Sequence, residues 1–139
     1  MSDRSALSQV ILEEEKISFE EYLLQYESFE GGRTEWLAGE VAIYPMPNNV
    51  THNSILSFLD ALFRLYLGLR GLGRVVIAGV PMKYSDAHPA REPDLMILLN
   101  QHLERLKSHY VDGVADIAIE VVSPESVARD HAEKFIEFE

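Results

Sequence analysis

Residues 94–99, with the sequence DLMILL, are apolar at every position after the opening aspartate. An apolar run this short, preceded by Pro93 and followed by a polar segment, is typical of a strand buried on both faces of a sheet. A second run of the same kind, ADIAIEVV, occupies residues 115–122. We therefore expect two buried strands, each with a carboxylate, Asp94 or Glu120, near one of its ends.

Helix and hairpin patterns precede these two runs. Residues 18–21, SFEE, have the form of a capping box that opens a helix ending near residues 26–29. Residues 33–37 and 40–44 predict a β-hairpin, because the Ala-Gly pair between them is a turn signal. Thr51 is the expected N-cap of the longest helix. The apolar residues of this helix recur at helical spacing, at Ile55, Leu59, Leu62, Phe63, Tyr66 and Leu69.

The remaining segments complete the pattern of an α/β protein. Residues 74–78 and 80–84 predict strands, residues 101–107 a short helix, and the segment after Ser123 an amphipathic helix. Such an order of helices and strands predicts a mixed β-sheet flanked by helices. The length of 139 residues predicts one domain, which we assign to residues 18–139, with residues 1–17 as a polar N-terminal arm.

The composition predicts a soluble, cytoplasmic protein. No apolar run approaches the ~20 residues of a membrane-spanning helix, and the N-terminus lacks the apolar core of a secretory signal. The absence of cysteine excludes disulfides, thiolate metal sites and cysteine nucleophiles. The net charge of −11 has the wrong sign for a protein that binds a polyanion, but residues 31–129 account for only −2 of it. The charge therefore weakens a nucleic-acid function without removing it.

The carboxylates of Asp94 and Glu120 are the first candidates for chemistry. An ionised carboxylate at a buried strand needs a partner, a cation or a raised pKa. Two carboxylates on neighbouring strands suit Mg²⁺ or Mn²⁺, which accept one or two carboxylates together with water and substrate oxygens. The alternative is that both side chains reach solvent or pair with arginine, and spacing alone leaves the two interpretations open.

Five short patterns in one order resemble a known family. The resemblance extends from about residue 18 to residue 134 and covers most of the chain. Its elements are Arg33-x-Glu35-Trp36-Leu37-x-Gly39-Glu40-Val41, His52, Pro93-Asp94, Glu120-Val121-Val122-Ser123-Pro124 and Asp130-x-x-x-Lys134. Together they resemble the Uma-type family of putative restriction endonucleases, which is common in cyanobacteria and related bacteria. This family belongs to the PD-(D/E)XK nuclease superfamily.

The resemblance implies a metal-dependent endonuclease that hydrolyses DNA phosphodiester bonds. By this match Asp94 and Glu120 are ligands of Mg²⁺ or Mn²⁺, with the backbone carbonyl of Val121 as a third ligand. Glu35 completes the metal shell or a second site. His52 is a candidate general base, metal-shell residue or phosphate contact, although a single histidine at a helix start is more often a packing residue.

Two departures from the superfamily pattern matter. The position two residues after the glutamate is usually lysine, and here it is Val122. The resemblance implies that Lys134, on the following helix, replaces it. We expect its ammonium within about 4–6 Å of the Asp94 or Glu120 carboxylate. The alternative is an exposed ion pair with Asp130. Relatives also continue beyond this helix, whereas this sequence stops at Glu139, so we expect a C-terminally short domain, either truncated or from a shortened member of the family.

These departures support a second hypothesis, a catalytically inactive binding or assembly module that keeps the nuclease fold. Val122, the acidic charge and the missing C-terminal strand all favour it, because a shortened sheet exposes an edge that can pair with another chain. A homodimer is compatible with either hypothesis. The long helix and the hairpin have more apolar surface than one short sheet covers, and two-fold dimers are the commonest soluble oligomers.

Overall fold

The structure is a computed structural model of the chain, which describes residues 10–11, 16–26, 29, 33–44 and 49–122. The described elements include the helices predicted near residues 18–26 and 51–70 and the strands predicted at residues 33–37, 40–44, 74–78 and 94–99. The strand predicted at residues 80–84 is reduced to two residues, and the short strands at residues 10–11 and 111–112 were not predicted. In chain order the described elements are β1 (Val10–Ile11), α1 (Phe19–Gln25), β2 (Arg33–Leu37), β3 (Glu40–Tyr44), α2 (Val50–Arg70), β4 (Gly73–Ile77), β5 (Met82–Lys83), β6 (Leu95–Leu99), the 3₁₀ helix η2 (Asn100–Arg105), β7 (Val111–Asp112) and β8 (Ile117–Ile119).

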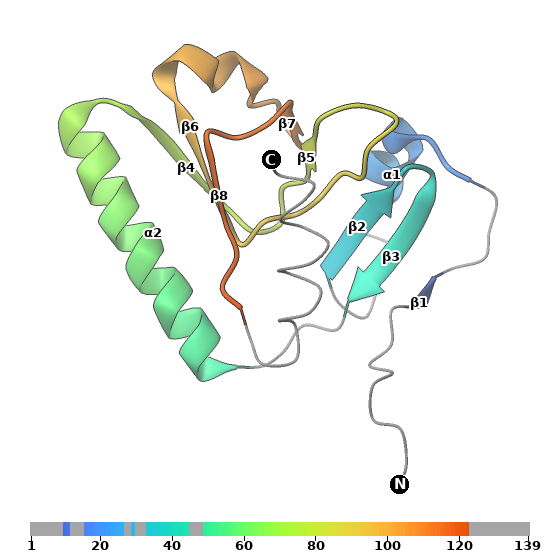
Figure 1. The fold of residues 1–139 in the computed structure, drawn as a ribbon, viewed down its shortest axis with the longest axis horizontal. Helices are drawn as coiled ribbons and strands as arrows, with labels where there is room; N and C mark the ends of the chain where they lie inside the picture. Colours follow the sequence, from blue (N-terminus) through green and yellow to red (C-terminus); the bar gives the residue numbers. More distant parts are fainter. Residues whose placement is uncertain (1–9, 12–15, 27–28, 30–32, 45–48, 123–139) are drawn as a thin grey trace, which may run out of the picture.

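The strands form three small sheets in the described part of the chain. One has the order β4-β6-β8, the second has the order β1-β3-β2, and the third pairs β5 with β7. The first two sheets are antiparallel and the third is parallel. Isolated bridges from Trp36 to Ala90 and from Met82 to Arg91 link the hairpin to β5. The predicted α/β class is therefore confirmed, with α2 and the β2–β3 hairpin on opposite sides of β6 and β8 (Figure 1).

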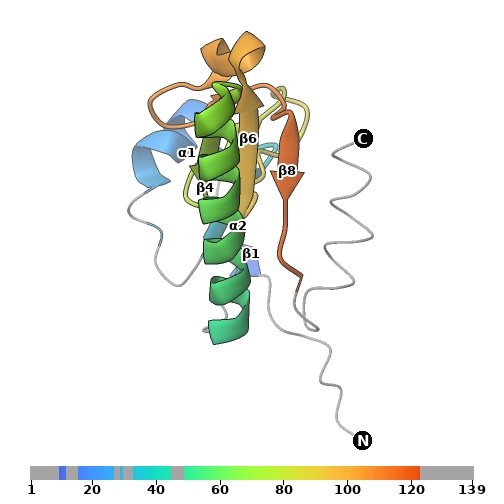
Figure 2. The same cartoon turned by 90° about the vertical axis from the view of Figure 1, so that its left-hand side faces the viewer.

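Strand β6 is the buried centre of the larger sheet. The side chains of residues 95–98 are at most 2% exposed, because both faces of the strand are covered. Leu95 and Ile97 pack with Leu67 of α2, and Met96 and Leu98 pack with Met82 and Val111 on the other face. The prediction of a second strand buried on both faces at residues 115–122 was wrong. β8 has only three residues, and Ile117 is 47% exposed. Within the described residues β8 pairs with β6 alone, and it lies beside α2 rather than beneath it (Figure 2).

Helix α1 covers one face of the hairpin. The predicted capping box is present, with the Ser18 side chain and the Glu21 side chain each bonded to the other residue's backbone N–H. Phe19 lies edge-on to Trp36, and the Tyr22 hydroxyl lies 3.0 Å from Thr34 Oγ1. Because successive residues of a strand face opposite sides, residues 33 and 35 of β2 point away from α1. The arm also contacts this unit, since β1 pairs with β3 and Trp36 Nε1 donates to the carbonyl of Ile17.

Helix α2 buries one face and exposes another apolar face. Its N-cap is Asn49, whose side chain accepts hydrogen bonds from the N–H groups of Thr51 and His52, so the prediction of Thr51 as the cap was wrong by two residues. The buried face packs on β4, β6 and β8 through Leu56, Leu59, Phe63 and Leu67. The residues predicted at helical spacing therefore divide between two faces. Side chains at least 44% exposed include Ile55, Phe58, Leu62, Leu65, Tyr66 and Leu69.

Two glycines provide a matched test of this packing. A Cβ on Gly73 would lie 2.2 Å from the carbonyl oxygen of Leu98, whereas a Cβ on Gly68 would meet nothing within 4 Å. We expect Gly73→Ala to destabilise the fold by about 1–3 kcal/mol, since β4 must move away from β6. Gly68→Ala should stabilise it by about 1 kcal/mol through helix propensity. Urea unfolding of both variants measures the difference, and equal effects would contradict the close approach of β4 and β6.

Candidate functional site

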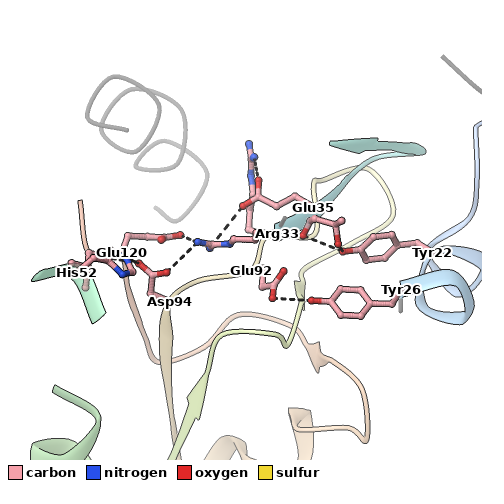
Figure 3. A network of polar contacts seen from close by, with 11 residues as sticks. Tyr22, Tyr26, Arg33, Glu35, His52, Glu92, Asp94 and Glu120 are labelled. Atoms are coloured by element: carbon pink, nitrogen blue, oxygen red, sulfur yellow. Dashed lines mark hydrogen bonds and ion pairs between the residues drawn. The ribbon is translucent and has the colours of Figure 1, made fainter. Parts of the chain in front are cut away.

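A buried arginine joins three of the predicted site residues. Arg33 is the first residue of β2, and its side chain is 13% exposed. Its Nη1 lies 3.1 Å from Asp94 Oδ1, and its Nη2 lies 3.2 Å from Glu120 Oε1 and 4.0 Å from Glu35 Oε1 (Figure 3). Burial alone would lower the pKa of Arg33, but the carboxylates of Glu120, Glu35 and Asp94 raise it above its usual value. The guanidinium therefore stays charged.

Asp94 precedes β6 and is the most connected of the carboxylates. Besides Arg33, its side chain accepts a hydrogen bond from the Val121 N–H, with 2.8 Å between Asp94 Oδ2 and the amide nitrogen. His52 Nε2 lies 3.3 Å from the same oxygen. His52 belongs to the first turn of α2, which the Asn49 cap fixes, so three distant segments converge on one aspartate. The hydrogen bond from the Val121 N–H also holds the segment after β8 against Asp94.

Glu35 forms a second ion pair. Arg91 Nη1 lies 2.6 Å from Glu35 Oε2, and the two side chains are 6% and 1% exposed. Arg91 is held in place by the backbone, since it exchanges two hydrogen bonds with Met82 of β5. This pair lies on the same side of β2 as Arg33, because residues 33 and 35 share a strand face.

Glu92 extends the site toward α1. Its side chain accepts a hydrogen bond of 2.8 Å from the Tyr26 hydroxyl, and Glu92 itself is 3% exposed. Burial raises the pKa of Glu92, while the Tyr26 hydrogen bond and the charge of Arg33 lower it in part. Burial also raises the pKa of Tyr26, and the negative charge of Glu92 adds to that increase. Tyr26 therefore stays protonated and donates its hydrogen to Glu92.

The charges of this cluster favour a cation. Four carboxylates, those of Glu35, Glu92, Asp94 and Glu120, surround two guanidinium groups, those of Arg33 and Arg91. With every carboxylate ionised and His52 neutral, negative charges exceed positive charges by two. The described residues contain no group of three or more acidic or histidine side chains arranged as a metal site. Two carboxylates with water suffice for Mg²⁺, so the pair Asp94 and Glu120 fits this ion.

The other predicted residues lie elsewhere or outside the description. Lys134 and Asp130 lie outside the described residues, so the expected position of the Lys134 ammonium stays a prediction. Lys83, a lysine on strand β5, lies 4.5 Å above the Phe19 ring and pairs with Asp86. It is therefore on the side of the hairpin that faces α1, opposite Arg33. Val122 is 40% exposed.

Sequence reasoning assigned no role to Arg33 or Glu92. A signal was present for both, because residues two apart on an extended segment share a face. Arg33 is two residues before Glu35 on β2 and shares its face, and Glu92 is two residues before Asp94. Composition could not reveal that the two faces meet, since Arg33 is 61 residues from Asp94 and 87 from Glu120 in sequence.

Comparisons with known proteins identify a family for the chain and a solved structure of similar fold. The family model described as Uma2, putative restriction endonuclease, matches residues 19–139. A solved structure of similar fold is a putative nuclease of DUF820 from Anabaena variabilis, with a TM-score of 0.56 and 16% sequence identity. The match covers 87% of this chain and 64% of that one, so the chain spans less than two thirds of its neighbour. A search of curated proteins found no match. None of the described helices is long and apolar enough to cross a membrane.

A buried pair, Arg91 with Glu35, and an exposed pair, Arg64 with Asp60, allow a direct test of the effect of burial. We expect Arg91→Met to destabilise the protein by about 3–5 kcal/mol, because it leaves the Glu35 carboxylate buried without its closest cation. Arg64→Met removes an exposed pair with Asp60 on α2 and should cost at most about 0.5 kcal/mol. Thermal and urea unfolding compare the two. Similar losses would contradict a structural role for the buried pair.

Proposed function

The chain belongs to the Uma2 family of putative restriction endonucleases, and from this membership we propose that it is a metal-dependent endonuclease acting on DNA. The observation that supports the proposal is the convergence of the Asp94 and Glu120 carboxylates on one cationic group at the ends of β6 and β8. We propose Asp94, Glu120 and the Val121 carbonyl as ligands of Mg²⁺ or Mn²⁺. A bound ion of this kind polarises a phosphoryl oxygen and lowers the pKa of its water.

The chain's own residues have distinct roles in this proposal. The Val121 amide fixes the orientation of Asp94, because it binds one carboxylate oxygen. His52, next to the same oxygen, is the candidate to accept a proton from the attacking water or to contact phosphate. Lys134 is the candidate to orient that water or to stabilise the charge that develops on phosphate. Glu35, which pairs with Arg91, either positions Arg33 or completes the set of acidic groups around the proposed ion.

DNA is the proposed substrate, and a bacterial cytoplasm is the proposed location. The net charge of −11 opposes contact with DNA, so binding would depend on cations at the site. The second candidate function is a non-catalytic module with the same fold. The bridge that Arg33 forms between Asp94 and Glu120 favours it, because an arginine can replace a metal as the permanent counter-charge of two carboxylates.

We also propose a homodimer in which α2 contacts a second copy of α2. The stripe Ile55, Phe58, Leu62, Leu65 and Leu69 advances in alternating steps of three and four residues, as in a seam between two helices. None of its members is charged, and each is at least 44% exposed, so the described residues leave a contiguous apolar stripe on this helix. A two-fold axis near Leu62, the middle of the stripe, places Ile55 opposite the partner copy's Leu69.

Cleavage of supercoiled plasmid tests the nuclease proposal. We expect cleavage with Mg²⁺ or Mn²⁺ and none with EDTA. Asp94→Asn and Glu120→Gln should each lower the rate at least about 100-fold, since each removes a charged ligand of the ion that would polarise the phosphate. Glu104→Gln, an exposed acid on η2, is the control and should keep full activity. Cleavage that persists in EDTA would contradict the proposal, and so would cleavage by both site variants at the native rate.

Lys134→Ala separates catalysis from metal binding. Because the proposed lysine acts on water or phosphate and not on the ion, the variant should lose activity while its Mn²⁺ affinity changes less than about twofold. Isothermal titration calorimetry measures the affinity, and plasmid cleavage measures the activity. Unchanged cleavage would assign Lys134 to the solvent-exposed pair with Asp130.

The dimer is tested by placing a charge within the stripe. Leu65 is 62% exposed, so Leu65→Glu leaves the core intact and puts a carboxylate in the proposed seam. We expect light scattering at about 50 µM to give a dimer for the native chain and a monomer for this variant. Ser57→Glu adds the same charge to the polar side of α2 and should leave the dimer unchanged. A native chain that is monomeric under these conditions contradicts the proposal.

A further inference from the structure

The proposed metal ligands are already engaged by an internal cation. Asp94 Oδ1 and Glu120 Oε1 are 3.1 and 3.2 Å from the two terminal nitrogens of one guanidinium group. We infer that Arg33 is a resident counter-cation that competes with the divalent ion, so that metal binding at Asp94 and Glu120 requires its guanidinium to leave. This inference rests on the proposed metal-dependent function.

Electrostatics prevents the two cations from sharing the site as it stands. A divalent ion binds carboxylate oxygens at about 2.0–2.1 Å for Mg²⁺, so an ion held by both carboxylates would use the oxygens that accept from the guanidinium here or the second oxygen of the same carboxylate. An ion at that distance would also lie within a few ångströms of the positive charge of Arg33. Repulsion at such separations is strong where water is largely excluded. Either Arg33 moves away or the metal does not bind.

The positive charge of Arg33 can leave the site only if the side chain moves, and not by loss of a proton. An arginine side chain keeps its positive charge at any working pH. Its Nε is buried and has no hydrogen-bond partner among the described residues, so the side chain is held through its two terminal nitrogens alone. Its two hydrogen bonds are to the groups that the metal would take, and the third carboxylate, that of Glu35, lies 4.0 Å from Nη2.

Removal of the guanidinium should therefore strengthen metal binding. Calorimetric titration with MnCl₂ compares the native chain with Arg33→Gln, Arg33→Lys and Arg64→Gln. We expect Arg33→Gln to bind Mn²⁺ at least tenfold more tightly, because a neutral side chain does not compete. Arg33→Lys keeps the charge and should stay within about threefold of the native chain. Arg64→Gln removes an exposed arginine of α2 and should leave the affinity unchanged.

A second measurement uses the native chain, in case Arg33→Gln fails to fold. The side-chain Nε–H signal of Arg33, identified in nitrogen-15 spectra by its absence from Arg33→Lys, reports the position of the guanidinium. Titration with diamagnetic Mg²⁺ should shift this signal with the same midpoint as metal binding. A signal that stays unchanged while Mg²⁺ binds would overturn the inference, because the guanidinium would then remain where it is.

The outcomes separate this inference from the proposed function. If the native chain and Arg33→Gln bind Mn²⁺ with equal affinity and cleavage is EDTA-sensitive, the competition is overturned. The nuclease proposal then still stands. No binding by either protein at millimolar Mn²⁺ would overturn both. Binding by Arg33→Gln alone would support the competition and show that Arg33 excludes the metal from the native chain, as the non-catalytic module requires.

Discussion

The guanidinium of Arg33 is the constraint on which the arrangement of this molecule depends. Carboxylates from the hairpin, from the start of β6 and from the end of β8 lie around it, in a region where water is scarce. Burying a carboxylate costs free energy, because its lost hydration is not replaced unless an opposite charge lies beside it. The hairpin and the larger sheet therefore meet where an arginine of one reaches the acids of the other.

The same requirement explains why a site for a cation and a structural ion-pair network occupy one place. Arg91 neutralises Glu35 closely, whereas Arg33 is divided among three acids. The cluster remains negative when its acids are ionised, and Glu92 responds with a raised pKa because it is buried beside them. A divalent ion would balance the charges that the two arginines leave over. The Uma2 family model matches residues 19–139, the range that contains these four acids.

Helix α2 connects the site with the outer surface. Its first turn presents His52 to Asp94, and its buried face packs on the sheet through residues such as Phe63 and Leu67. The face that exposes Phe58 and Leu65 has no partner among the described residues that would cover it. The helix packs one side on the larger sheet, and no other described element covers the opposite side.

Local rules in the sequence determined the secondary structure and the candidate acids. The apolar run ending at Leu99, the capping box at Ser18 and the hairpin turn each follow from interactions between residues close in sequence, and each was predicted correctly. Asp94 and Glu120 were found because a carboxylate stands out beside a buried strand. Only the tertiary structure decided that Arg33 lies between them, that β8 is a partly exposed edge and that α2 has two apolar faces. These features depend on which strands pair and which face of a helix meets the sheet, and periodicity along the chain does not contain that information.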